Sequence, residues 1–139
     1  MSNNVTSVPA APSALAQAHF EQEFSFQTDC WDVHDALSGS QPGFVLLDVR
    51  SPEKYNHGHV PGAVNLPHGK IIESKINQWP VGTLFITYCA GPHCNGAAHA
   101  ALRLSKLGRP VKIMAGGITG WLDEGFALQQ QSDQRAATG

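Results

Sequence analysis

The residue best placed for chemistry is Cys89, which ends an apolar run over residues 83–88 and precedes a loop containing glycine. A helical pattern over residues 97–107 begins directly after that loop. This order puts a thiol where a strand passes into a helix, so that main-chain N–H groups and the positive end of the helix dipole face the sulfur. Such surroundings favour thiolate over thiol. The sequence therefore predicts that Cys89 is a nucleophile.

The loop after Cys89 supplies the rest of the predicted site. We expect its main-chain N–H groups to hold a bound anion, with Gly91 and Gly96 allowing them to turn inward and Pro92 leaving one gap. His93 can lend a proton or a positive charge, or it is an exposed loop residue without a role. The predicted anion-binding residues are Ala90, Gly91, His93, Cys94, Asn95, Gly96 and Ala97.

Composition limits the classes of function. The chain has 139 residues, 42% of them apolar and 14% charged, and a formal net charge of −2, which predicts one core and no basic field for nucleic acid. No apolar stretch is long enough to span a membrane, and the start does not resemble a secretory signal, so we expect a soluble, cytoplasmic protein without a membrane partner. An odd count of three cysteines favours reduced thiols over a disulfide framework.

Strand and helix patterns alternate along the chain. We expect a flexible leader over residues 1–20, one domain over 21–128 and a polar tail over 129–139. Thr28 or Asp29 can cap a helix with Trp31 on its apolar side. The strands are expected at residues 24–26, 43–49, 83–88 and 111–114, with a turn and a brief edge strand within 60–67. The helices are expected at 29–38, 51–57, 70–78, 97–107 and around Trp121 and Leu122. This alternation predicts a parallel α/β sheet with right-handed crossovers.

Ligands of such sheets bind beyond the carboxyl ends of the strands, where Asp48 and Arg50 also fall. The pair orients the loop, or Arg50 attracts an anionic donor, or the two form a salt bridge that ties the loop to the sheet. Cys30 lies away from this edge by sequence and is expected to be a small buried residue. We expect His57, His59 and His68 on the surface or in local hydrogen bonds, and Trp121 in the core.

Four segments together resemble the single-domain rhodanese family. They are Leu47-Asp48-Val49-Arg50, Tyr55 with Gly58-His59-Val60-Pro61-Gly62-Ala63-Val64-Asn65-Leu66-Pro67, Tyr88-Cys89, and Gly116-Gly117-Ile118-Thr119-Gly120-Trp121. The resemblance runs from about Phe24 to Phe126 and implies a rhodanese-like three-layer sandwich, with a five-stranded parallel sheet flanked by helices. It also implies that Cys89 carries sulfane sulfur as a persulfide.

Cys94 marks a departure from that family. Active members usually have a cysteine loop of the form C-x-x-G-x-R-S, and Cys94 stands where their arginine would be. Either Cys94 is a small residue filling that place, or it is a second thiol that resolves a sulfenate or persulfide on Cys89 through an internal disulfide. The spacing of the two cysteines and His93 lacks a second ligand pair for zinc, so we expect no metal and no cofactor.

The predicted function is a thiosulfate-type sulfurtransferase with Cys89 as the nucleophile. Its expected partners are a small sulfur donor and a thiol or cyanide acceptor, or a protein that accepts sulfur. The alternative is a non-catalytic or redox-responsive binding and regulatory module of the same fold. A phosphatase of this fold is disfavoured, because it would need an arginine at the position of Asn95.

Overall fold

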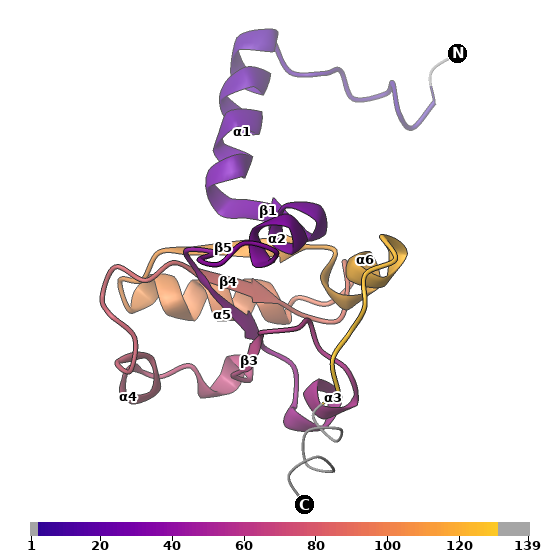
Figure 1. The fold of residues 1–139 in the computed structure, drawn as a ribbon. Coiled ribbons are helices and arrows are strands. Elements are labelled where there is room, and N and C mark those ends of the chain that lie inside the picture. Colours follow the sequence, from indigo (N-terminus) through magenta and orange to yellow (C-terminus); the bar gives the residue numbers. More distant parts are fainter. Residues whose placement is uncertain (1–2, 131–139) are drawn as a thin grey trace, which may run out of the picture.

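The computed structural model describes residues 3–130, within which five strands form one sheet between layers of helices (Figure 1). The strands are β1 (Gln27–Asp29), β2 (Val45–Asp48), β3 (Val64–Asn65), β4 (Phe85–Tyr88) and β5 (Val111–Ala115). Their order is β1-β5-β4-β2-β3, and every neighbouring pair is parallel. The predicted five-stranded α/β fold is confirmed, with β4 at the centre of the sheet.

Helices cover both faces of the sheet. They are α1 (Ser13–Phe26), α2 (Cys30–Leu37), α3 (Pro52–His57), α4 (Glu73–Ile76), α5 (Gly96–Lys106), α6 (Gly117–Asp123) and the 3₁₀ turn η1 (His68–Lys70). Side chains alternate across a strand, so Leu47 and Phe85 are buried with Leu104 of α5 on one face. On the other face Leu46 and Ile86 are buried with residues of α2 and α6. The three-layer arrangement follows from this alternation.

Capping side chains, a glycine and flanking prolines mark the ends of several helices and strands, as expected from the sequence. The side chain of Asp29 accepts a hydrogen bond from the Asp32 N–H at the start of α2, and Ser51 does the same for Lys54 at the start of α3. Gly108, with a φ of 77°, follows the end of α5. β3 lies at the edge of the sheet, as expected for a strand preceded and followed by proline.

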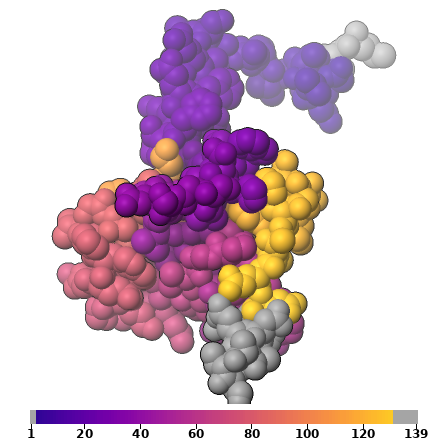
Figure 2. All heavy atoms as spheres, in the orientation of Figure 1, coloured from indigo at the N-terminus to yellow at the C-terminus, as the bar shows by residue number. Residues whose placement is uncertain are grey.

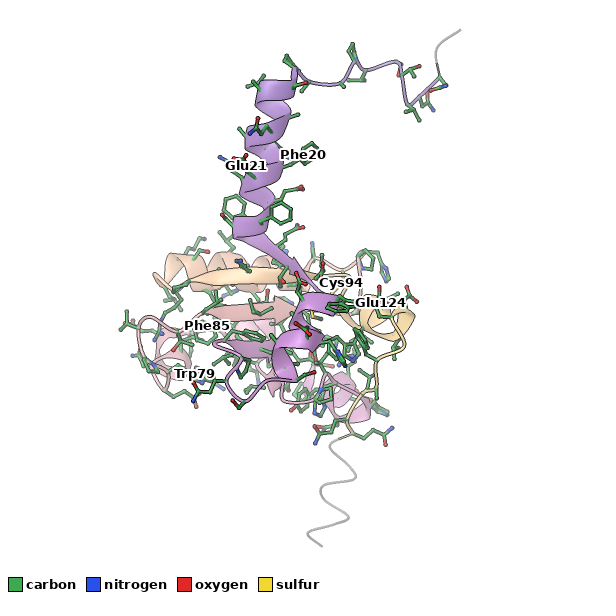
Figure 3. All side chains as sticks on the ribbon, turned by 45° about the horizontal axis from the view of Figure 1, so that its top comes forward. Phe20, Glu21, Trp79, Phe85, Cys94 and Glu124 are labelled. Carbon is green, nitrogen blue, oxygen red and sulfur yellow. A yellow bond between two sulfur atoms is a disulfide. The ribbon has the colours of Figure 1, made fainter. Side chains whose placement is uncertain are left out.

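The N-terminal predictions need correction. Residues 24–26 are not a strand but the end of α1, and the strand beside β5 begins only at Gln27. The period-two pattern of Phe24 and Phe26 is too short to distinguish a strand from a helix. Residues 13–20, within the predicted leader, are also helical, and α1 stands away from the sheet without a buried residue (Figures 1 and 2). Phe20 and Glu21 point outward from it (Figure 3).

Two further expectations concern single segments. Trp31 does not belong to the apolar side of α2, because its side chain is 57% exposed. Most of the predicted tail over residues 129–139 lies outside the described residues. Gln129, at its start, exchanges main-chain hydrogen bonds with His59 of 2.9 and 2.8 Å.

Candidate active site

Cys89 directly follows β4, and its side chain is 7% exposed on the face of the sheet covered by α5. Gly96, the first residue of α5, leaves room for the sulfur, since a Cβ added there would lie 2.9 Å from Cys89 Sγ. Gly96 and Gly91 were expected to serve by turning the backbone, but neither has a positive φ. Gly96 therefore serves by close approach, and the first turn of α5 contacts the sulfur as the strand-to-helix pattern predicts.

The main chain of the loop is anchored by α6. The N–H groups of Ile118 and Thr119 donate to the carbonyl oxygens of Cys89 and Ala90, at 3.1 and 2.9 Å. In a trans peptide the N–H points opposite to the C=O, so the amides of Ala90 and Gly91 face away from α6. The approach is so close that a Cβ on Gly117 would collide with the Cys89 carbonyl oxygen. This contact requires glycine at position 117, and the left-handed backbone at Gly116, with a φ of 94°, favours the other glycine.

Cys94 returns to Cys89 through a tight turn. The Cys94 N–H donates to the Gly91 carbonyl oxygen at 3.1 Å, with Pro92 at the second position of the turn, where its fixed φ is favourable. The Sγ atoms of Cys89 and Cys94 are joined as a disulfide, with their Cα atoms 6.4 Å apart. The expectation of reduced thiols is thus wrong for this pair, because the turn brings two cysteines that are five positions apart within bonding reach.

Cys30 is the one free cysteine among residues 3–130. It is buried, as expected, but it is not remote from the motifs, since its Sγ donates to the carbonyl oxygens of Ala115 and Gly117 at 3.6 and 3.5 Å. Burial, followed by the negative charges of Asp29 and Glu124, raises the pKa of the Cys30 thiol to about 11. Cys30 therefore stays a neutral thiol beneath the glycine pair.

A pocket of about 570 Å³ opens beside the two loop cysteines. It is lined by Val49, Arg50, Ser51, Lys54, Pro67, His68, Gly69, Lys70, Cys89, Ala90, Cys94, Asn95 and Gly96. Lys54 and Lys70 are exposed at this pocket, and none of these lining residues carries a carboxylate. Sequence reasoning missed both lysines, although each follows a strand at the carboxyl edge of the sheet. The pocket is suited to an anion.

Asp48 and Arg50 form a buried network beside the pocket. The Asp48 carboxylate is fully buried and accepts from Arg50 Nη2 at 2.6 Å and from the Tyr88 hydroxyl at 2.7 Å. The Tyr88 oxygen in turn accepts from the Val60 N–H at 3.0 Å. Burial and then the Asp48 charge raise the pKa of Tyr88. Burial lowers the pKa of Arg50, but its hydrogen bond and ion pair with Asp48 outweigh this, and the net shift is upward.

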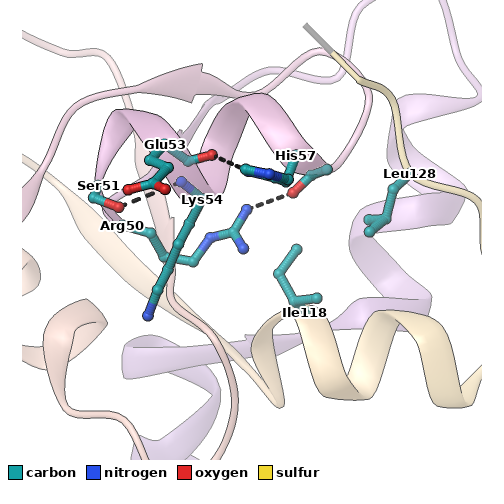
Figure 4. A pocket seen from close by; sticks show the side chains of 8 residues that line it. Arg50, Ser51, Glu53, Lys54, His57, Ile118 and Leu128 are labelled. Atoms are coloured by element: carbon teal, nitrogen blue, oxygen red, sulfur yellow. Dashed lines mark hydrogen bonds between the residues drawn. The ribbon is translucent and has the colours of Figure 1, made fainter. Parts of the chain in front are cut away.

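Arg50 also donates to the Gly58 carbonyl oxygen at 2.6 Å (Figure 4). The guanidinium is thus held by α3 and by the sheet, as the salt-bridge interpretation expects. Beside it, a second hollow of about 460 Å³ includes Lys54, Ile118 and Leu128 but neither loop cysteine. Arg50, Ser51 and Lys54 line both this hollow and the cysteine pocket. Asp48 pairs with the charge of Arg50, so the exposed Lys54 and Lys70 supply the positive charge at the cysteine pocket.

Other predicted positions have more local roles. Asn95 stands at the N-cap of α5 but makes no side-chain cap bond, and His93 is exposed. His59 is 2% exposed, stacks on Tyr55 and hydrogen-bonds through Nδ1 to the Tyr55 carbonyl oxygen at 2.8 Å. Figure 3 places Cys94 at the opposite end of the sheet from Phe85, the first residue of β4.

Residues 3–130 offer neither a clustered metal site nor a membrane-spanning helix. Nowhere in that range do three or more His, Cys, Asp or Glu side chains group so that they could hold a metal ion. None of its helices has the length and apolar character needed to cross a membrane.

The chain was compared with known proteins and structures. The HTH-type transcriptional regulator Rv0324 of Mycobacterium tuberculosis is 31% identical over 86 residues, covering 62% of this chain and 38% of that protein. The adenylyltransferase and sulfurtransferase UBA4 of Meyerozyma guilliermondii is 32% identical over 98 residues, covering 66% of this chain and 23% of that protein. The chain thus matches well under half the length of either relative.

Structural comparison agrees with the sequence matches. The crystal structure of the BH2092 protein from Bacillus halodurans superposes with a TM-score of 0.82 at 34% identity, covering 86% of this chain and 87% of that one. The family model of the rhodanese-like domain matches residues 32–124, which include β2, the cysteine loop and the glycine pair. With its motifs at the carboxyl edge of a five-stranded parallel sheet, the chain belongs to the rhodanese-like domain family.

Proposed function

We propose that this chain is a sulfurtransferase that takes sulfane sulfur from an anionic donor such as thiosulfate, holds it as a Cys89 persulfide and passes it to a thiophilic acceptor. The observation that supports this most is the position of Cys89 Sγ, in contact with the first turn of α5 and beside a pocket lined by cationic groups and no carboxylate. A helix N-terminus and exposed lysines both stabilise a thiolate and attract an anion. The proposal includes a reducing, cytoplasmic setting, since the nucleophile must be a free thiolate.

The first half-reaction follows from the reduced form of the site. The Cys89 thiolate attacks the outer sulfur of thiosulfate, the Cys89 sulfur–sulfur bond forms, and the bond to the sulfonate group breaks, so that sulfite leaves with the electron pair. Lys54 and Lys70 hold the donor and offset the charge of the leaving sulfite. In the second half-reaction cyanide or a thiolate attacks the outer sulfur and Cys89 leaves as thiolate.

The test is thiosulfate-to-cyanide transfer by the full chain after reduction and removal of the reductant. We expect thiocyanate formation by the wild type and by Cys30→Ala, whose buried thiol faces α6, and none by Cys89→Ser. Intact mass after thiosulfate should rise by one sulfur atom in Cys94→Ser, which keeps Cys89 but lacks the second loop thiol, and should stay unchanged in Cys89→Ser. Thiocyanate formation at the background rate by the reduced wild type, together with an unchanged mass for reduced Cys94→Ser, would contradict the proposal.

The role of the pocket charge is tested separately with the double variant Lys54→Ala/Lys70→Ala. Each exposed charge contributes about 0.2–1 kcal/mol, so the KM for thiosulfate should rise ~2- to ~30-fold, with a smaller rise at high salt. Lys75→Ala/Lys106→Ala removes two lysines that do not line the pocket and should leave KM unchanged. An equal rise in the KM for thiosulfate in both double variants would mean that the net charge of the protein, and not the position of Lys54 and Lys70, determines this KM.

A second candidate is a redox-responsive regulatory module. The observations that favour it are the Cys89–Cys94 disulfide and the similarity to a transcriptional regulator. A module of this kind needs no turnover, so its reduced form would give no thiocyanate. Transfer with multiple turnovers by the reduced protein would exclude it.

A further inference from the structure

The two loop sulfurs are arranged for reaction with each other. The turn closed by the Cys94 N–H and the Gly91 carbonyl oxygen returns Cys94 to the end of β4. The Cα atoms of Cys89 and Cys94 are 6.4 Å apart, within the usual disulfide range of about 4.4–6.8 Å. The disulfide thus forms without unfolding the loop or the first turn of α5.

Both sulfurs also face the same pocket. Cys89 is buried and Cys94 is half-buried, and the two line the pocket together with the cationic side chains. The third cysteine cannot compete, because Cys30 lies in the core cluster on the other face of the sheet and donates to the carbonyl oxygens of Ala115 and Gly117. A sulfur atom carried by Cys89 therefore has Cys94 as its nearest intramolecular thiol partner among the described residues.

We propose that Cys94 discharges the Cys89 persulfide by releasing its outer sulfur as hydrosulfide, which gives this chain a sulfide-releasing activity. This rests on the proposed function, because it starts from the loaded enzyme. The Cys94 thiolate attacks Cys89 Sγ, the Sγ–Sγ bond forms, and the bond between Cys89 Sγ and the outer sulfur breaks. Hydrosulfide leaves with the electron pair and takes up the proton lost by Cys94.

One further reactant, a dithiol reductant, is needed to complete the electron balance of the cycle. Cys94 is oxidised as the outer sulfur is reduced, and the product is the disulfide seen in the structure. A dithiol reductant then restores both thiols, and the sum of the steps is thiosulfate plus dithiol giving sulfite, hydrosulfide and oxidised dithiol. An internal thiol five residues away acts at an effective concentration of millimolar or more, so it can compete with dissolved thiols.

The experiment is a single turnover of the full chain without oxygen or added thiol. Reduced wild type, Cys94→Ser and Cys30→Ala are each mixed with one equivalent of thiosulfate, and sulfite, hydrosulfide, free thiols and intact mass are followed. Wild type and Cys30→Ala should release one equivalent each of sulfite and hydrosulfide, lose two thiols, and end two hydrogen atoms lighter than the reduced protein. Cys94→Ser should release sulfite, keep the added sulfur and yield no hydrosulfide, and later cyanide should recover that sulfur as thiocyanate.

The outcomes separate the two proposals. If no protein releases sulfite or gains sulfur, the proposed transferase function fails. If wild type gains sulfur but holds it as stably as Cys94→Ser, the role of Cys94 is refuted while the transferase function stands. Cys94→Ala serves as a second variant, and hydrosulfide release by both Cys94 variants at the wild-type rate would likewise overturn the inference.

Discussion

Replacing Gly96 by alanine tests how closely α5 must approach the sulfur. The added Cβ would lie 2.9 Å from Cys89 Sγ and 3.6 Å from Cys94 Sγ, whereas ordinary contacts are 3.4–4 Å. Overpacking of this kind costs about 1–3 kcal/mol. Because the φ of Gly96 is not positive, the backbone accepts alanine, and its better helix propensity offsets about 0.5–1 kcal/mol of that strain.

The strain that remains acts on Cys89 Sγ, and on a second sulfur atom when Cys89 carries one. We therefore expect the free energy of unfolding to fall by no more than about 2.5 kcal/mol. The kcat/KM for thiosulfate-to-cyanide transfer should fall by ~5- to ~150-fold if the transition state, with a second sulfur at Cys89, carries ~1–3 kcal/mol more strain than the free enzyme. Urea unfolding and steady-state kinetics of the reduced protein measure the two quantities.

The matched control is Gly69→Ala. Gly69 lines the same pocket, but a Cβ added there has no atom within 4 Å and its φ is not positive. This variant should keep wild-type transfer. A Gly96→Ala protein with wild-type kcat/KM and full sulfur loading would refute the idea that contact with α5 defines the sulfur site.

Three further variants test the buried groups by urea unfolding. Asp48→Ala should lower the free energy of unfolding by about 3–5 kcal/mol, because it leaves the buried guanidinium of Arg50 uncompensated; a loss below 1 kcal/mol would contradict this. Tyr88→Phe removes the acceptor of the Val60 N–H and should lower the free energy of unfolding by about 1–3 kcal/mol. An unchanged urea midpoint would count against a stabilising role of the Asp48–Tyr88–Val60 hydrogen bonds. Folding raises the pKa of Cys30 from 9.0 to about 11, so the stability gained by keeping this thiol neutral is complete below pH 9.0 and is lost as the pH rises through about 11. Cys30→Ala should therefore lose less stability over that range than the wild type, and parallel pH curves would disprove the shift.

Much of the fold was predictable because its signals are local. The apolar runs before Asp48 and Cys89 marked the two buried central strands, and Asp29 and Ser51 marked helix starts through their own side-chain hydrogen bonds. The end of α1 was mistaken for a strand, since three alternating residues do not distinguish the two states.

The candidate site was only partly predictable. Cys89 followed from its place between a strand and a helix, which sequence order alone expresses. Lys54 and Lys70 stand far apart along the chain and meet at one pocket only because β2 and β3 are neighbours in the sheet.

Sequence by itself determined the order of elements from β2 onward, the loop that carries the cysteine and the turn that can return Cys94 to it. Tertiary structure decided that Tyr88 and Arg50 share one buried carboxylate, that Cys30 lies beneath the glycine pair, and that two lysines line the same pocket as the loop cysteines. The division has a physical reason. Capping, turn geometry and side-chain alternation act between residues a few positions apart, whereas a buried ion pair or a charged pocket depends on which strands become neighbours when the whole sheet assembles.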